Sequence, residues 1–324
     1  MRFKETQLIV FLLLFSCSKV EDDAGGLKWR WLFSGKEEVA TQRLVYEERF
    51  GNGNTIRLNQ SMAVFKDKAF CFNDGKECRV YDLKTMLKNQ AKELPDYSHH
   101  NNAQFLKKYY QEGDKYPLLL LSRGDYPPNQ SDLYVVRVTE ENDCFSFTIV
   151  KTIHNTLKEA QYNGSWVADE DHNKLFLYCM TSGDWRTKEE NVFCIYSFPL
   201  PDTSSKEDVT LGYEDVLDRW DYEYLIHQGG TYYNGYLFFN VEGLTWLKGA
   251  FLNYYKNIIA INVDNGLSEI SLPLDDYKET EGISVYDEKL YVSFKNGNAE
   301  LQPEDIVFSL YEYSLPSILT NVVR

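Results

Sequence analysis

The feature that most constrains the fold is a pattern that returns five times along the chain: two short β-rich runs joined by a polar turn. The clearest copy spans residues 280–294, where Thr-Glu-Gly-Ile-Ser-Val-Tyr, Asp-Glu and Lys-Leu-Tyr-Val-Ser-Phe follow one another. Residues 59–72 and 227–239 align with it directly, and looser copies begin at residues 99 and 163. Such runs around a short polar turn are typical of β-hairpins. The chain is therefore predicted to be a repeat protein built from hairpins.

A third β-rich run follows each hairpin, at residues 78–83, 133–138, 192–198, 258–263 and 306–313. In most copies a turn and a weaker fourth run come next, as at residues 268–272. The hairpins begin 40, 63, 65 and 53 residues apart, counted between residues 60, 100, 163, 228 and 281. Units of about four strands at this spacing indicate a β-propeller. We predict an all-β, five-bladed propeller of four-stranded antiparallel blades, formed as one domain by residues 27–324.

Ring closure is predicted from the two ends of the repeat region. Residues 43–50 form a strand candidate that belongs to no repeat, and the last repeat lacks an obvious fourth strand. Adding the N-terminal strand to the last blade would complete that blade and remove exposed strand edges. A six-bladed propeller, with part of a sixth blade within residues 29–57, is the alternative.

The first residues of the chain predict export and lipid attachment. Arg2 and Lys4 precede an apolar run over residues 8–15, which has the length of a signal-peptide core and is too short for a spanning helix. Ser16-Cys17 after this run resembles a bacterial lipoprotein signal, in which residues 1–16 would be removed and Cys17 lipidated. An ordinary secretory signal with an incidental cysteine is the alternative.

Residues 18–23, Ser-Lys-Val-Glu-Asp-Asp, resemble the acidic tether of surface-displayed lipoproteins of Bacteroidetes, so residues 17–26 are interpreted as a lipidated tether. The hairpin at residues 281–292 also resembles the blade openings of many bacterial propellers. Together these features resemble an uncharacterised Bacteroidetes-type β-propeller lipoprotein. The resemblance implies a lipid anchor in the outer membrane of a Gram-negative bacterium, facing the cell surface, as the sole membrane attachment.

The net charge excludes one class of partner. The formal charge is −15 at pH 7, and nucleic-acid binding requires clustered Lys and Arg to neutralise phosphates. We therefore expect no nucleic-acid partner.

Five cysteines follow Cys17 in a chain expected to leave the cytoplasm, where disulfides persist. Cys71 and Cys78 flank a turn at Asp74-Gly75 that would place them opposite each other, and Cys179 and Cys194 lie on successive strands of the third repeat. These are two candidate disulfides, and buried thiols are the alternative. The spacing of Cys and His predicts no metal site.

The candidate binding site comes from aligning the starts of the five innermost strands. One column is polar in every repeat and the next is small, with Gly or Ser in four of the five repeats. Innermost strands line the central channel, so these positions should ring its mouth. The predicted ligand-binding residues are Gln60, His100, Asn101, Asn102, Asn163, His227, Gln228 and Glu281. The alternative is that they cap strand ends and hold ordered water.

This ring favours binding over catalysis. We expect a ligand-binding or scaffold protein whose partner is a glycan, a peptide or an envelope protein. The alternative is a glycoside hydrolase, since five-bladed propellers include enzymes that place two or three carboxylates in the channel. Here Glu281 is the one ring carboxylate, so we lean against an enzyme and assign no catalytic residue beyond it. No cofactor is expected, although a cation among the ring amides is compatible with the pattern.

Overall fold

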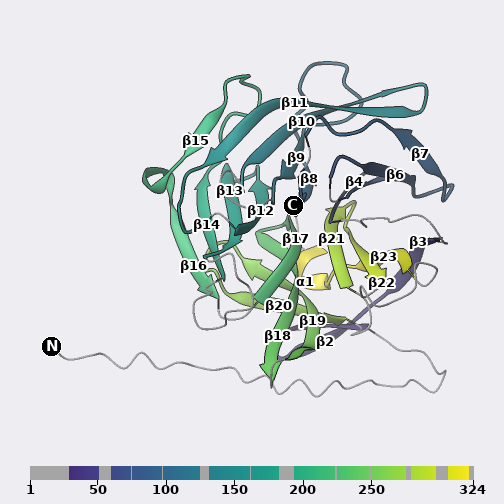
Figure 1. Cartoon of the computed structure of the whole chain (residues 1–324). Coiled ribbons are helices and arrows are strands. Elements are labelled where there is room, and N and C mark those ends of the chain that lie inside the picture. Colours follow the sequence, from purple (N-terminus) through teal and green to yellow (C-terminus); the bar gives the residue numbers. More distant parts are fainter. Residues whose placement is uncertain are drawn as a thin grey trace.

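The structure is a computed structural model that describes residues 29–50, 60–73, 75–96, 98–124, 131–160, 162–181, 193–222, 225–247, 250–274, 279–296 and 306–320. These residues are mostly β-strand and form five blades around a central axis (Figure 1). The predicted five-bladed propeller is therefore confirmed.

Each blade begins on the axis and runs outwards through antiparallel neighbours. The innermost strands are β4 (Ser61–Phe65), β8 (Ala103–Phe105), β12 (Tyr162–Asp169), β17 (Leu225–Tyr233) and β21 (Glu279–Tyr286). The second strands are β5 (Lys68–Phe72), β9 (Leu119–Ser122), β13 (Lys174–Met180), β18 (Tyr236–Leu247) and β22 (Lys289–Asn296). The third strands are β6 (Cys78–Asp82), β10 (Leu133–Glu141), β14 (Phe193–Pro199), β19 (Ala250–Asn262) and β23 (Ile306–Ser314). The fourth are β7 (Lys88–Ala91), β11 (Cys144–Asn155), β16 (Asp218–Tyr222), β20 (Ser268–Leu274) and β3 (Gln42–Phe50).

The two ends of the innermost strands define two faces of the ring. We call the end where these strands start the mouth face, and the end where they turn into the second strands the turn face. On the turn face, Lys66, Asn173, Asn234 and Asp287 adopt positive φ angles between 46° and 54°. Tight hairpins need this left-handed conformation to match the twist of their strands. The polar turns recognised in the sequence therefore close hairpins on one face.

The N-terminal segment closes the ring, as predicted. Strand β3 pairs antiparallel with β23, with Gln42 opposite Tyr313 and Phe50 opposite Ile306. Two further strands, β1 (Trp29–Phe33) and β2 (Lys36–Ala40), were not predicted and extend the fourth blade outside β20. Trp31 Nε1 donates to the carbonyl of Ser314, 2.8 Å away, at the end of β23. The segment thus binds both the fourth and the fifth blade.

The first two blades share a continuous sheet, which the repeats did not predict. Strands β7 and β11 pair in parallel at Cys144–Gln90 and Phe145–Ala91. The short strand β15 (Val209–Leu211) pairs in parallel with the other half of β11. Two short helices, η1 (Tyr213–Asp215) and α1 (Ser317–Thr320), complete the described elements.

The buried apolar residues explain why the ring has five blades and not six. Among the described residues they fall into five clusters, and each cluster lies between two neighbouring blades. Trp166 and Phe198, for example, pack between the second and third blades, and Tyr178 and Phe239 between the third and fourth. Tyr81 and Phe308 meet between the first and fifth blades, in stacked rings 5.4 Å apart. This last seam closes the ring without a sixth blade.

The predicted register of Cys71 and Cys78 is wrong. Cys71 lies opposite Arg79, and Cys78 lies opposite Phe72. The amide of Asn73 donates to the carbonyl of Glu77 at 2.9 Å, so the connection is longer than a two-residue turn. Because side chains alternate along a strand, this one-residue offset puts the two thiols on opposite faces of the sheet. By contrast, Cys179 and Cys194 lie directly opposite each other, as expected.

The expected signal peptide, the tether and Cys17 lie outside the described residues. Among the residues that are described, no helix is long and apolar enough to cross a membrane.

Candidate functional site

The start of the innermost strands is irregular in three of the five blades. The ladder of β12 skips between Tyr162 and Ser165, that of β17 between His227 and Gly230, and that of β21 between Thr280 and Gly282. The skipped positions include the predicted ring residues Asn163, Gln228 and Glu281. A β-bulge leaves a residue out of the ladder and redirects its neighbours, and bulges are enriched next to functional sites. The polar-then-small columns of the sequence therefore correspond to bulges.

Asn102 ties three blades together instead of facing a ligand. Its Nδ2 donates to the carbonyl of Trp166 at 2.8 Å, and its Oδ1 accepts the amide of Gly230 at 2.9 Å. The side chain is 1% exposed. One step deeper, Gln104 exchanges two hydrogen bonds with the backbone of Ala168, at 2.8 and 2.9 Å. These amides satisfy the backbone of neighbouring innermost strands, which have no sheet hydrogen bonds to each other.

Gly229 lies in the bulge of β17 and packs closely against oxygen atoms of neighbouring strands. Its φ of +138° suits glycine, and a Cβ there would lie 3.2 Å from the carbonyl oxygen of Glu281. The next nearest atoms are Asn240 Oδ1 at 3.4 Å and Asn102 Oδ1 at 3.6 Å. Asn240 is fully buried, and its Oδ1 has no hydrogen-bond partner among the described residues.

Glu281 is buried and its charge is balanced. The residue is 1% exposed, and Lys295 Nζ lies 3.6 Å from its Oε1. The Lys295 side chain on β22 is 25% exposed, so it extends from the buried Glu281 carboxylate towards solvent. Next to Glu281, the amide of Gly282 donates to Ser293 Oγ at 2.8 Å, which satisfies the bulged backbone.

The other predicted ring residues divide by exposure. His100 and Asn101 are buried, at 1% and 4% exposure, and the His100 ring meets the Phe72 ring edge-on at 6.4 Å. Gln60 and Gln228 are half-buried. The backbone of Asn163 and His227 belongs to β12 and β17, but their side chains lie outside the described residues. Among the predicted residues with described side chains, Gln60 and Gln228 are thus the ones a ligand can reach.

Two residues of this site were missed by the sequence analysis. Lys295 and Asn240 lie on second strands, whose positions were not aligned across the repeats. Asn240 interrupts an otherwise apolar run, Leu-Phe-Phe-Asn-Val, and a buried amide in such a run is a usable signal for a polar role.

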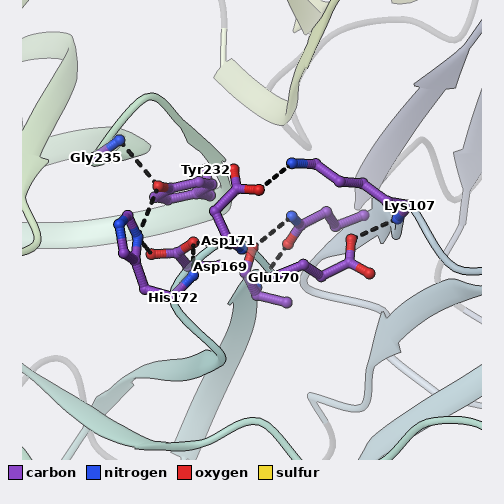
Figure 2. A network of polar contacts seen from close by, with 9 residues as sticks. Lys107, Asp169, Glu170, Asp171, His172, Tyr232 and Gly235 are labelled. Carbon is purple, nitrogen blue, oxygen red and sulfur yellow. Dashed lines mark hydrogen bonds and ion pairs between the residues drawn. The ribbon is translucent and has the colours of Figure 1, made fainter.

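The turn face carries a different polar network, shown in Figure 2. Asp169, which is fully buried, accepts a bond from His172 Nδ1 at 2.7 Å and from two amides of its own turn. Tyr232 OH lies 3.5 Å from the same nitrogen and accepts the amide of Gly235 at 3.0 Å. Lys107 bonds to Glu170 and Asp171 of the turn. The third blade is therefore linked to both of its neighbours at this end.

The described residues contain no group of three His, Cys, Asp or Glu side chains placed to hold a metal ion.

Comparison with known proteins bears on the fold alone. The structure is similar to glutaminyl cyclase from Myxococcus xanthus, with 10% identity over 85% of this chain and 97% of that chain and a TM-score of 0.44. It is also similar to a GH43 endo-arabinanase from Bacillus licheniformis, with 12% identity, coverages of 81% and 96%, and a TM-score of 0.45. A member of the DUF4221 family from Bacteroides vulgatus has 10% identity, coverages of 89% and 99%, and a TM-score of 0.39. The sequence matches no family model, and no curated protein matches it at a significant level.

Proposed function

We propose that this protein is a lipid-anchored envelope protein that binds a polar ligand at the mouth face of its propeller. The observation that carries the proposal is the set of bulges at the start of β12, β17 and β21. They interrupt the ladder at Asn163, Gln228 and Glu281, which are polar positions of the repeats. Regular strands would bury the axis equally well, so the irregularity favours a binding role for this end.

The polar side chains at the mouth indicate the ligand class. Gln60 and Gln228 are half-buried amides, and Lys295, which pairs with Glu281, has a side chain that is 25% exposed. The innermost strands of the first and fifth blades are in close contact at this face, since a Cβ at Gly282 would lie 2.6 Å from Met62 Cβ. Hydroxyl and amide groups complement this surface, which favours a glycan or a peptide.

Cleavage of a glycan with Glu281 as acid or base is the alternative function. Two features weigh against it: Glu281 is buried beside Lys295, and the other ring positions carry amides and imidazoles where hydrolysis needs a second carboxylate. Glu281→Gln separates the two functions. Binding survives this nearly isosteric change, whereas acid–base catalysis falls about 100-fold or more.

The location of the protein is part of the proposal. Its support is the N-terminal sequence, with Cys17 after a short apolar run and an acidic tether. Surface display would bring the mouth face into contact with extracellular glycans, peptides or a partner protein.

The test is a thermal-shift screen of the chain from Glu21 onward against glycans, peptides, and mono- and divalent cations. A ligand at 100 times its Kd adds about 2.7 kcal/mol to the free energy of unfolding. We expect Gln60→Ala/Gln228→Ala to abolish the shift. The matched control is Gln90→Ala, which truncates an exposed glutamine on the outer strand β7 and should keep the full shift.

Two outcomes would contradict the proposal. A shift that is equal in the parent and in the Gln60→Ala/Gln228→Ala variant would place the ligand elsewhere. No shift with any compound would favour the scaffold function, which pull-down of envelope proteins with the same variants then tests.

A further inference from the structure

We propose that Cys179 and Cys194 form a disulfide in the exported protein. The two residues face each other across the β13–β14 ladder, and their Sγ atoms lie 3.6 Å apart. Both side chains are fully buried. The inference is independent of ligand binding and requires only that the chain reaches an oxidising compartment.

The backbone already has the geometry that this bond needs. Directly opposite residues of an antiparallel pair have Cα atoms about 4.5 to 5.5 Å apart, and disulfides span about 4.4 to 6.8 Å. Both thiols point into the cluster between the second and third blades, with Trp166, Leu177 and Tyr196. The side chains can therefore close the bond by small rotations, without a change in strand register.

The remaining cysteines serve as internal controls. Cys71 belongs to the cluster between the first and fifth blades, and Cys78 to the cluster between the first and second. They lie on opposite faces of one sheet and cannot pair without breaking its register. Cys144 is half-buried at the start of β11, and its Sγ contacts the carbonyl of Phe145. The geometry therefore selects one pair out of five cysteines.

The bond forms by thiol–disulfide exchange with a disulfide oxidoreductase. The Cys194 thiolate attacks the disulfide of the oxidant and releases one of its thiols. The Cys179 thiolate then attacks Cys194 Sγ and releases the second thiol, so two protons and two electrons leave this chain and the oxidant is reduced.

Burial also sets when the bond forms and how it is reduced. An oxidant reaches the two thiols while the third blade is still packing, before the cluster around Trp166 closes. Once the blade is packed, the bond is shielded from solution reductants. Reduction should therefore require denaturation.

The experiment compares the full chain isolated from the cell envelope with the chain from Glu21 onward made in the cytoplasm. Each sample is denatured in a thiol-alkylating reagent, digested without reductant and analysed by mass spectrometry. For the envelope sample we expect a linked Cys179–Cys194 peptide, with Cys71, Cys78 and Cys144 alkylated. The cytoplasmic sample should have all five alkylated.

A refolding experiment tests the disulfide even if the chain is not exported. The denatured chain is refolded in glutathione redox buffer, and the same peptide should appear. Cys179→Ala/Cys194→Ala should lower the Tm of the oxidised protein by roughly 5 °C and remove the Tm difference between samples that were denatured and refolded with and without reductant. Cys78→Ala, the matched control, should keep the reduction-dependent shift.

The proposal is overturned if Cys179 and Cys194 are alkylated in both the envelope and the refolded samples. A linkage between any other pair overturns it as well. Failure to find the chain in the envelope, with the linked peptide present after refolding, would contradict the location and leave the disulfide standing.

Discussion

The two faces of the propeller are built from the same five innermost strands, yet the backbone of these strands is regular at the turn face and bulged at the mouth face. On the turn face four of the strands end in tight hairpins, and the polar groups of Figure 2 are bonded within the turns or to neighbouring blades. On the mouth face three of the strands bulge, and glycine and buried amides replace regular pairing.

The two faces differ in how the backbone of the innermost strands is hydrogen-bonded, because ladder hydrogen bonds are interrupted at the bulges of the mouth face. Regular hairpin ends need only the right turn residues, whereas a bulged end must satisfy its backbone with side chains such as Asn102 and Ser293. We expect substitutions at the mouth face to cost more stability than matched ones at the turn face.

The largest difference is expected between two glycine substitutions. Gly282→Ala places a methyl group 2.6 Å from Met62 Cβ and 2.7 Å from its backbone nitrogen, so two innermost strands must separate. We expect a loss of about 3 kcal/mol in the free energy of unfolding. Gly235→Ala on the turn face meets no atom within 4 Å and bears only the strain of its φ of +80°, about 1 to 2 kcal/mol. Urea denaturation measures both, and equal losses would contradict the comparison.

Truncation of one polar side chain at each face should give the next difference. Asn102→Ala leaves the Trp166 carbonyl and the Gly230 amide buried without their partner, which should cost about 2 to 4 kcal/mol. Lys107→Ala removes an exposed ion pair with Asp171 and should cost less than about 1 kcal/mol. Chemical denaturation of the two variants measures both losses. A loss below about 1 kcal/mol for Asn102→Ala would show that the blades do not depend on the hydrogen bonds of Asn102.

Ion pairs at the two faces should respond differently to salt. Glu281 and Lys295 are 1% and 25% exposed, so their coupling energy, about 1 to 3 kcal/mol, should persist in about 1 M salt. The coupling of Lys107 with Asp171, 70% and 54% exposed, should disappear there. Double-mutant cycles with Glu281→Gln/Lys295→Met and Lys107→Met/Asp171→Asn measure the two energies. A salt-sensitive Glu281–Lys295 coupling would mean that water reaches the pair.

The smallest effects concern two glutamates whose pKa values move in opposite directions. Burial raises the pKa of Glu77 on the mouth face, but its bond with Arg79 outweighs burial and holds the pKa below 4.5. Its stabilisation is present above about pH 4.5 and is lost as the pH falls through the folded-state pKa. Burial raises the pKa of Glu170 on the turn face, so its contribution is present below about pH 4.5 and is lost as the pH rises.

Tm measured between about pH 3 and pH 7 tests both signs. Glu77→Gln should flatten the loss of stability on the acid side. Glu170→Gln should instead raise Tm relative to the parent towards neutral pH. If both substitutions changed the pH dependence of Tm in the same direction, the opposite pKa shifts assigned to Glu77 and Glu170 would be contradicted.

Much of the fold could be predicted because hairpins are local. Alternation and turn residues fix which residues pair across residues 280–294 or 59–72, and the leftover strand at residues 43–50 indicated how the ring closes. The parallel pairing of β7 with β11 and the position of β1 and β2 outside β20 could not be predicted. Such pairings depend on which strand edges remain open after the blades have packed.

The site was predictable as a set of positions but not as a set of roles. The polar column containing Gln60, Gln228 and Glu281, and Asn102 beside it, were found from the sequence. Asn102 nevertheless proved to hold three blades together, and Glu281 proved to be a buried partner of Lys295. Whether a polar residue at a strand start faces solvent or a neighbouring blade depends on bulges, which shift the backbone by one residue.

The sequence by itself determined the repeat, the turn residues and the closing strand, because these depend on neighbours along the chain. The tertiary structure decided the register at Cys71 and Cys78 and which ring residues, such as Asn102 and Glu281, are buried. A connection only a few residues longer or shorter shifts a strand by one residue and moves every side chain to the other face. That choice is made by the packing of the blades against one another.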